Sequence, residues 1–234
     1  MASLELGEEN EVRYTLHGAA FLLELNPRQV RRWSEGYTEM RRGHAHFRKG
    51  VLTRHRDPDE PVLFNFYELI ELLWVKKLIQ PRDGQKALTT LDGVRRIVEA
   101  LAPTLGRYPL ASARFKSVGS QLVTESEVDG QLVNILKQQR LAAFADEIAE
   151  VVKFDADGLA NALFLNKNHT IRIERNVRFG QPILASNIPA DLVYRRYLAD
   201  GGDVPGTAQW FRISESEVMD AVRFGEERLS ESAA

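Results

Sequence analysis

The chain contains no cysteine. This absence excludes a disulfide framework, a thiolate nucleophile and a zinc site built on cysteine ligands. The sequence also lacks any run close to the roughly 20 apolar residues that a membrane-spanning helix needs. Its first residues, Met1 to Glu11, are acidic, whereas a signal peptide begins basic and continues apolar. We therefore expect a soluble protein of the cytoplasm.

Enzyme motifs are missing as well. The sequence has no Walker-type phosphate loop, no dinucleotide-binding glycine fingerprint and no nucleophile elbow. His44 and His46 offer two metal ligands without a third, so a basic loop is the better interpretation. Asp155 and Asp157 offer paired carboxylates, but the turn-rich segment ending in Gly158 favours a role in bending the chain. We expect no metal, no cofactor and no catalysis.

The net charge is close to zero, but positive charge is concentrated in one segment. The net charge of the 234 residues is -2, yet Asn26 to Arg56 holds nine cationic side chains against two carboxylates, a local +7. The rest of the chain is therefore acidic. Such a cationic block is typical of a phosphate-binding surface, whose affinity comes largely from counterion release. A charged face that only meets solvent is the alternative.

Two short helices are predicted beside this block. Thr15 suits the cap of the first, whose apolar residues recur at helical spacing at Leu16, Ala20 and Leu23. Asn26 suits the cap of the second, and Pro27 its first position, where the missing N–H costs no hydrogen bond. Gly36 ends this second helix.

The second helix is predicted to have an apolar side and a donor side. Val30 and Trp33 share the apolar side. The donor side, suited to phosphates and base edges, carries Arg28, Gln29, Arg31 and Arg32. A wing is predicted from two short strands, 50–53 and 61–64, around the turn at 57–60. Further DNA-contacting cations are Arg41, Arg42, Arg48, Lys49 and Arg54.

Two longer helices follow. Asn65 and Glu68 form a capping-box pattern ahead of a helix that breaks near Pro81 and Gly84. Its apolar residues are Phe66, Leu69, Ile70, Leu73 and Leu78. The next helix begins after Thr89 or Thr90 and is stopped by Pro103 and Gly106; its apolar stripe is Leu91, Val94, Val98 and Leu101.

The order of these elements resembles the winged-helix domain of MerR-type regulators, from Tyr14 to about Leu101. The resemblance rests on the helix, the turn, the arginine-rich helix ending in Arg31-Arg32-Trp33, the wing and the two later helices. The family's effector-binding cysteines and long dimerisation coiled coil are absent, so a metal- or drug-sensing role does not carry over.

The middle of the chain has a period of two. Phe115, then Leu122 and Val123, then 132–135 lie in short segments, and Asp129-Gly130 is a hairpin signal. We expect a small antiparallel β meander here. A helix is predicted over 141–154, followed by a joining segment over 155–168.

The C-terminal part carries the second resemblance. A strand is predicted at 170–173, and helices near 190–200, 207–211 and 214–227, the last with a Ser214/Glu217 capping box. Together with the string from Val177 to Pro189, this resembles the homeodomain-like antitoxin modules that pair with PIN-type ribonuclease toxins. Partner-binding candidates are Arg178, Phe179, Arg195 and Arg196. The last two could contact DNA or a partner, although a role as ordinary surface residues fits them slightly better. Ala185-Ser186-Asn187 departs from the family's Gly-Thr-Arg, so any role of that arginine is not transferred.

We therefore predict an α+β, mainly α protein: a MerR-like winged helix-turn-helix over 12–106, a β meander with a helix over 107–168 for connection or dimerisation, and a three-helix homeodomain-like module over 169–229. The pair of resemblances implies a VapB-type antitoxin that represses its own operon as a homodimer on operator DNA and neutralises a PIN-type toxin. The alternatives are a stand-alone MerR-like regulator and a protein-interaction adaptor with an acidic partner.

Overall fold

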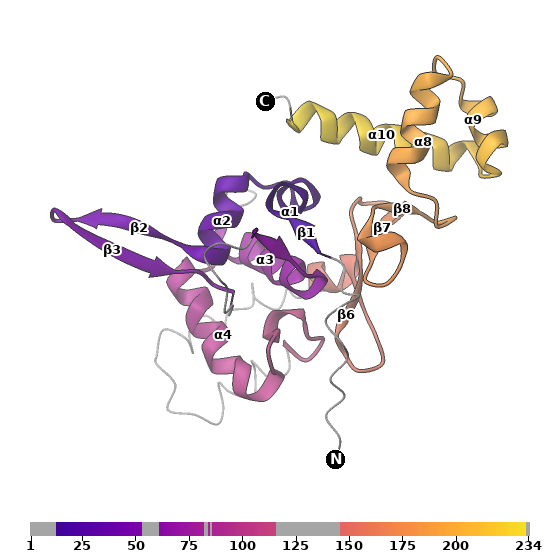
Figure 1. The fold of residues 1–234 in the computed structure, drawn as a ribbon. Coiled ribbons are helices and arrows are strands. Elements are labelled where there is room, and N and C mark those ends of the chain that lie inside the picture. The colour runs from indigo at the N-terminus through magenta and orange to yellow at the C-terminus, as the bar shows by residue number, and fades with distance from the viewer. Residues whose placement is uncertain (1–12, 53–60, 82–83, 85, 116–145, 233–234) are drawn as a thin grey trace. The chain divides into compact units, whose positions relative to one another are not determined.

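The computed structural model describes residues 13–52, 61–81, 84, 86–115 and 146–232 (Figure 1). The chain forms two compact units, one from Thr15 to Asn161 and a second that contains Ala162 to Ala234. Both mix helices with small sheets, in agreement with the predicted α+β class.

The first unit is mainly helical. Its elements are β1 Tyr14–Thr15, α1 Leu16–Leu23, α2 Pro27–Glu35, β2 Gly36–Arg41, β3 His44–Lys49, β4 Leu63–Phe64, α3 Phe66–Ile79, α4 Leu91–Leu105, the 3-10 turn η2 Pro109–Ala111 and β5 Val152–Phe154. Strands β2 and β3 form an antiparallel hairpin that projects from the helices, and β1 pairs with β4 (Figure 1). Residues 146–151 are helical, so the helix predicted over 141–154 gives way to β5 at Val152.

Local capping defines where the helices of this unit begin. The Thr15 hydroxyl accepts a hydrogen bond from the Gly18 N–H at 3.0 Å. Before α3, the Asn65 and Glu68 side chains each accept the other's backbone N–H at 2.9 Å, which confirms the predicted capping box. Such bonds satisfy backbone donors that have no partner within the helix.

The fourth helix is capped as predicted but ends later than its proline suggests. Thr90 accepts a hydrogen bond from Gly93 N–H, and the helix runs through Pro103 to a cap at Gly106. The φ of proline suits a helix, and Pro103 is exposed in the last turn. The carbonyl that loses its partner there can therefore bind water.

Helix α3 is the centre of the first unit. It packs against α1, α2, α4 and η2, and most of its side chains are buried. Two aromatic contacts hold it: near its start the Tyr67 ring stacks on Tyr108 with centroids 5.0 Å apart, and past its middle Trp74 meets Phe115 edge-on at 4.5 Å. Burial of this helix supplies the platform on which α1 and α2 are held.

The second unit combines a sheet with three helices. Its elements are β6 Ala160–Phe164, β7 Ile171–Glu174, the 3-10 turn η3 Arg178–Gly180, β8 Ile183–Leu184, α8 Ala190–Ala199, α9 Val204–Phe211 and α10 Glu215–Ser232. The strand order is β5-β6-β7-β8, the last two pairs being antiparallel, and the boundary between the units falls within β6. The segment 155–168, predicted only to join two parts, therefore contains a strand of this sheet.

Helix α9 begins earlier than its glycine suggests. The Asp203 side chain accepts a hydrogen bond from Gly206 N–H at 3.0 Å, and the Thr207 hydroxyl donates to the Asp203 carbonyl at 2.7 Å. Pro205 lies in the first turn, where no N–H is needed. These capping bonds offset the poor helix propensity of Gly206.

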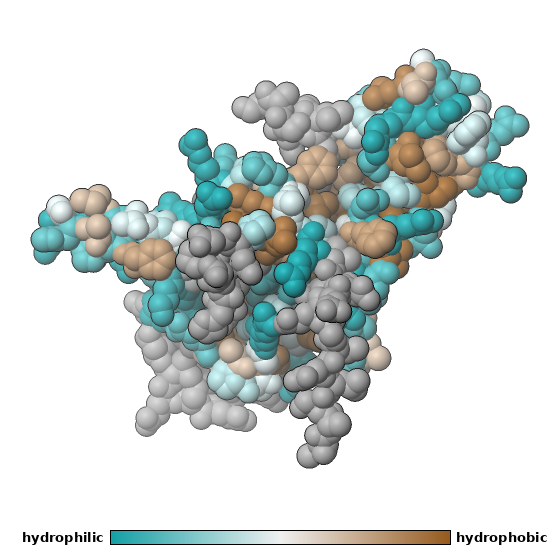
Figure 2. All heavy atoms as spheres, in the orientation of Figure 1, coloured by the Kyte–Doolittle hydropathy of each residue, from teal (hydrophilic) through white to brown (hydrophobic). Residues whose placement is uncertain are grey.

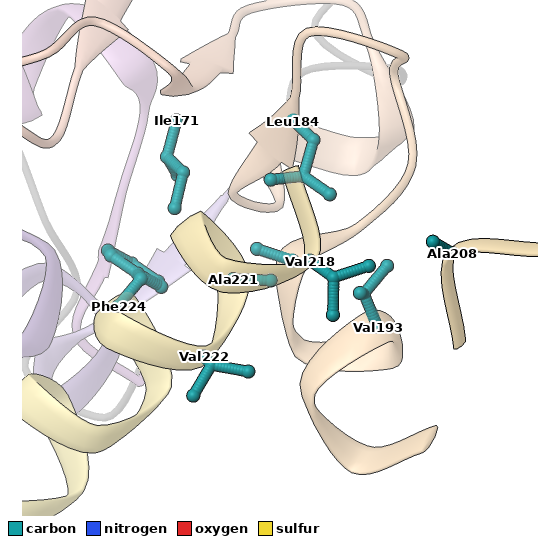
Figure 3. Packing of buried hydrophobic residues seen from close by; sticks show 9 residues of the cluster. Ile171, Leu184, Val193, Ala208, Val218, Ala221, Val222 and Phe224 are labelled. Carbon is teal, nitrogen blue, oxygen red and sulfur yellow. The ribbon is translucent and has the colours of Figure 1, made fainter. Parts of the chain in front are cut away.

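The core of the second unit brings its helices and sheet together (Figure 3). Val193 of α8, Ala208 of α9 and Val218 of α10 meet Ile171 and Leu184 from the strands. Each helix thus buries one side, as the predicted strand at 170–173 and the three predicted helices require.

Part of the predicted middle region lies outside the described residues. The segments expected to form the meander beyond Phe115, including Asp129-Gly130, fall within 116–145. Of the helices in the part of the chain that the structure describes, none has the length and apolar character to cross a lipid bilayer.

Candidate nucleic-acid interface

Helix α2 starts at a complete capping box. Asn26 accepts a hydrogen bond from Arg28 N–H at 2.8 Å, and the Gln29 side chain accepts one from Asn26 N–H at 3.2 Å. Pro27 occupies the first turn, and the helix ends where Gly36 N–H donates to the Arg32 carbonyl. All of these positions agree with the sequence prediction.

The two predicted sides of α2 are confirmed. Val30 and Trp33 are buried in the first unit. Ser34 is buried beside them, and its hydroxyl donates a hydrogen bond to the Val30 carbonyl at 2.8 Å. The side chains outside this apolar stripe are all exposed: Arg28, Gln29, Arg31 and Arg32. Three guanidinium groups are therefore held at the surface by the burial of the opposite side.

Two of these arginines have neighbours at the surface. Arg31 lies 3.5 Å from the Glu35 carboxylate one turn later, with 61% of its side chain exposed. Arg32 lies over the Tyr37 ring, its guanidinium carbon 3.7 Å from the ring centroid. The first contact is an exposed ion pair of little energetic weight, and the second orients Arg32 without using its hydrogen-bond donors.

Gln29 has a structural task in addition to its predicted one. Its side-chain oxygen accepts the Asn26 N–H in the capping box. Recognition of adenine by an amide side chain uses both the oxygen and the NH₂ group. Within the capping box, only the NH₂ group of Gln29 is left to donate to a base or phosphate.

The hairpin lies closer to α2 than the predicted wing. We expected its strands at 50–53 and 61–64, but β2 and β3 occupy 36–49, with the turn at Arg42-Gly43. Both turn residues have positive φ, 52° and 82°, as a two-residue hairpin turn requires. The predicted pairing of 50–53 with 61–64 is therefore wrong in the described residues, since 50–52 form no strand and β4 at Leu63–Phe64 pairs with β1. The predicted turn at 57–60 lies outside the described residues. His44 and His46 lie in β3 rather than in a loop.

The base of the hairpin is fixed to the end of α2 by two close backbone approaches. A Cβ atom on Gly36 would lie 2.1 Å from the Arg48 carbonyl oxygen, and one on Gly50 would lie 2.0 Å from that of Ser34. In addition, Val51 N–H donates to the Trp33 carbonyl at 2.6 Å. The helix and the hairpin therefore form one continuous element with no linker between them.

The predicted cations of this region divide between the hairpin tip and its base. Arg41 and Arg42 are exposed at the tip, and Lys49 is exposed at the base. Arg48 pairs with Glu39 on the facing strand at 2.9 Å, and the hydrogen bond and charge of that carboxylate raise the pKa of Arg48. Arg54 lies outside the described residues.

Metal binding has no support in the residues that the structure describes. His44 and His46 share one face of the hairpin with Glu39, yet the described ranges contain no group of three potential ligands close enough to hold an ion. Asp155, for its part, accepts hydrogen bonds from the backbone N–H groups of Asp157 and Leu159, the bending role expected for it.

The partner-binding candidates lie in the second unit. Phe179 exposes 87% of its surface, and both it and Arg178 have positive φ, an uncommon conformation for residues with a side chain. Arg195 is exposed and pairs with Asp191. Arg196 pairs with Asp200 and lies over the ring of Trp210, so its guanidinium already has partners within the chain.

Sequence reasoning missed three side chains of the hairpin. Tyr37 holds Arg32, and Met40 and Phe47 are large apolar side chains exposed on the hairpin. Their signal was the alternation of polar and apolar residues over 37–41 and 44–48, which predicts two strands and was passed over when the strands were expected at 50–53 and 61–64. In the second unit, the exposed Trp210 was likewise not singled out.

Comparison with known proteins identifies a shared fold. No family model and no curated protein matches the chain. A solved structure, the X-ray crystal structure of Rv2018 from Mycobacterium tuberculosis, superposes with a TM-score of 0.64 at 15% identity, covering 89% of this chain and 96% of that one. At this identity the match shows that the two chains have similar folds.

Proposed function

We propose that this protein binds double-stranded DNA through α2 and the β2–β3 hairpin. The observation that carries the proposal is the exposure of Arg28, Arg31 and Arg32 on α2 while Val30 and Trp33 anchor its other side. The adjoining hairpin extends the same cationic surface with Arg41 and Arg42 and other basic residues.

The dimensions and chemistry of α2 suit a major groove. A helix of nine residues is about 14 Å long, and the major groove is about 12 Å wide, which admits a helix. Guanidinium groups recognise guanine through two parallel hydrogen bonds and also bind phosphates. The exposed pair between Arg31 and Glu35 is weak, so a phosphate or base can replace the carboxylate.

The test is a salt titration of DNA affinity. The double change Arg31→Ala and Arg32→Ala is expected to weaken binding to a duplex selected by the chain from a random library, and to flatten the dependence of log Kd on log salt, because fewer counterions are released. Arg223→Ala is the matched control, since Arg223 is also exposed and pairs with a nearby carboxylate, Asp220, on a helix. Equal affinity and slope for the double variant and the wild type would contradict the assignment.

We also propose that the second unit binds a protein, a PIN-type ribonuclease toxin, so that the chain acts as an antitoxin repressing its own operon. The support is the resemblance of 177–189 and of the Ser214/Glu217 box to antitoxin modules, together with exposed apolar side chains on this unit. Phe179, Leu198 and Trp210 are exposed there, and exposed aromatic side chains are characteristic of interface anchors.

One departure from the family pattern has a local structural role here. Asn187 stands where the family has arginine; its φ is 63°, and its side-chain oxygen accepts a hydrogen bond from Arg172 at 2.7 Å. Asn187 thus has a structural role in this turn, at the position where the family has a positively charged side chain. Any toxin contact must therefore use other groups, with Phe179 and Arg195 as the candidates.

Co-expression with the neighbouring gene tests this second role. A small nuclease encoded beside this gene is expected to co-purify with the full chain, and Phe179→Ala with Trp210→Ala to release it while DNA binding persists. DNA binding without any such neighbour or complex would favour the alternative, a stand-alone regulator. Homodimerisation on a palindromic operator is expected in either case, because DNA-binding helices of this size normally act in pairs.

A further inference from the structure

The β2–β3 hairpin has two chemically different faces. Residues paired across an antiparallel ladder lie on the same face, and the faces alternate along each strand. The register therefore defines a polar face, made of Tyr37, Glu39, Arg41, His44, His46 and Arg48. The opposite, apolar face is made of Thr38, Met40, Ala45 and Phe47, with Gly36 and Lys49 at its base.

The apolar face is open to solvent. Met40 exposes 71% of its surface and Phe47 exposes 65%. The two side chains stand on neighbouring strands in diagonal positions, within reach of each other. Figure 2 shows hydrophobic and hydrophilic residues together on the projecting hairpin. Folding of the first unit does not bury these two side chains, so their apolar character is available to a ligand.

We propose that Phe47 and Met40 form a wedge that enters the minor groove of bound DNA, opens a base step and bends the duplex. This inference rests on the proposed DNA binding and adds a specific action of the hairpin. Proteins that kink DNA from the minor groove insert side chains of this kind, phenylalanine and methionine among them, between base pairs.

Charge favours DNA over a second copy of the chain as the occupant. The hairpin carries four cationic side chains, Arg41, Arg42, Arg48 and Lys49, against the single carboxylate of Glu39. Of these cations, Lys49 lies at the base of the apolar face, Arg42 in the turn, and Arg41 and Arg48 on the polar face. A duplex supplies phosphates for cations on all of these sides, whereas a second, equally cationic hairpin supplies none.

Area favours the same occupant. A fully buried aromatic side chain contributes roughly 150–250 Å², and Met40 and Phe47 are 71% and 65% exposed. The two side chains of both copies together could thus bury only roughly 400–700 Å², below the about 1,000 Å² of a stable protein interface. A wedge between base pairs needs no large area, because it acts on one step of the duplex.

The position of the hairpin is consistent with this contact. It begins at Gly36, directly after the last residue of α2, and its six-residue strands extend about 20 Å. With α2 in a major groove, the hairpin crosses the phosphate backbone towards the neighbouring minor groove. Tyr37 lies on the polar face and contacts Arg32, so the polar face lies on the side of the α2 arginines and the apolar face on the opposite side, where it can meet a base step.

The experiment measures bending and affinity separately. A duplex selected by the full chain from a random library carries fluorophores at both ends for energy transfer, and 2-aminopurine at successive steps reports unstacking. The variants are Phe47→Ala with Met40→Ala, the conservative Phe47→Trp, and Met219→Ala as a control at an exposed methionine of the second unit. Sedimentation measures the association state of each variant without DNA.

The wedge predicts that wild type and Phe47→Trp shorten the end-to-end distance and raise 2-aminopurine fluorescence at one step. The double alanine variant should lose both signals and about tenfold in affinity, as for an aromatic side chain removed from a base, while the salt slope stays the same because no phosphate contact is lost. A wild-type complex with straight DNA, or a double variant that still bends it, overturns the wedge alone. A change in sedimentation on removing the two side chains would assign the apolar face to self-association instead. Failure of the wild type to bind any duplex would overturn the proposed function itself.

Discussion

The guanidinium of Arg32 lies over the ring of Tyr37, 3.7 Å from its centroid, and so links the last turn of α2 to the first strand of the hairpin. Arg32 keeps its five donors available while its position is restricted. Because the side chain is already restricted before binding, the entropic cost of holding it against DNA is smaller.

Tyr37→Leu is therefore expected to weaken DNA affinity by about two- to fivefold, the weight of an exposed cation–π contact. Tyr37→Phe keeps the ring and should bind like the wild type. Fluorescence anisotropy with the selected duplex measures both. An equal loss in the two variants would instead assign the effect to the phenol hydroxyl.

Gly36→Ala and Gly50→Ala are expected to destabilise the first unit by about 2–4 kcal/mol, because the new Cβ would meet a carbonyl oxygen at 2.1 Å and 2.0 Å respectively. Gly43→Ala is the control, since its φ is also positive but no atom lies within 4 Å of the added carbon. It should cost only about 1–2 kcal/mol, the strain of a left-handed residue. Urea unfolding followed by tryptophan fluorescence compares the three variants. Equal losses of unfolding free energy would show that the close backbone approaches at Gly36 and Gly50 have no energetic role.

Buried Glu71 should make the first unit less stable as pH rises. Burial raises the pKa of Glu71 from its ordinary 4.5 to about 8, although Leu110 N–H donates to its carboxyl group at 3.3 Å. Between these values the folded state holds a proton that the unfolded state has released. The contribution of this group to the free energy of unfolding is therefore fully present below pH 4.5. It decreases between pH 4.5 and about pH 8, by at most about 1.4 kcal/mol per pH unit.

Glu71→Gln should remove this slope, while Glu99→Gln at an exposed position of α4 should keep it. Urea unfolding at several pH values, in a Trp210→Phe background, makes Trp33 and Trp74 of the first unit the reporters. A slope between pH 5 and 8 that is the same in Glu71→Gln as in wild type would show that another group is responsible.

Glu217 should have the opposite effect in the second unit. Burial alone would raise its pKa, but hydrogen bonds from Ser186 and Ser214 outweigh this and hold the pKa of Glu217 below its ordinary value; the Ser186 N–H donates at 3.0 Å. The stability from this carboxylate is therefore present above pH 4.5, its ordinary pKa, and is lost as pH falls through the lower folded value.

Glu217→Ala should cost about 1 kcal/mol at neutral pH, as for other capping boxes, and the difference from wild type should shrink in acid. Glu215→Ala, in the same helical turn, is the control. Hydrogen exchange of α8 to α10, measured by mass spectrometry, reports the second unit alone. If protection from exchange falls equally in both variants, Glu217 does not stabilise the second unit more than its neighbour Glu215 does.

The helices could be predicted from the sequence because their signals are local. Asn26 with Pro27, and Asn65 with Glu68, mark helix starts within three residues, and Gly36 and Gly106 mark ends. The apolar stripe of α2 followed from spacing alone. The exposed arginines of the candidate site were therefore predictable as the other side of that stripe.

The hairpin was harder to predict, because its turn is atypical and its alternating residues are mostly exposed. Arg42-Gly43 lacks the Asn or Asp usual in a two-residue turn, although polar and apolar residues alternate over 37–41 and 44–48. The close approaches of Gly36 to Arg48 and of Gly50 to Ser34, which fix the hairpin to α2, have no sequence signal of their own. The role of Gln29 in capping was visible in its spacing from Asn26, but the same residue also suited DNA recognition.

The two-sided hairpin restricts how the chain can change in length. Each strand alternates between the faces, so a single inserted or deleted residue near Thr38 would turn Met40 to the side now held by Arg41 and would turn Glu39 away from Arg48. Insertions that preserve both faces add two residues to each strand, which lengthens the β2–β3 hairpin by about 7 Å. Homologous proteins that keep the two-faced hairpin should therefore differ by an even number of residues in each of its strands.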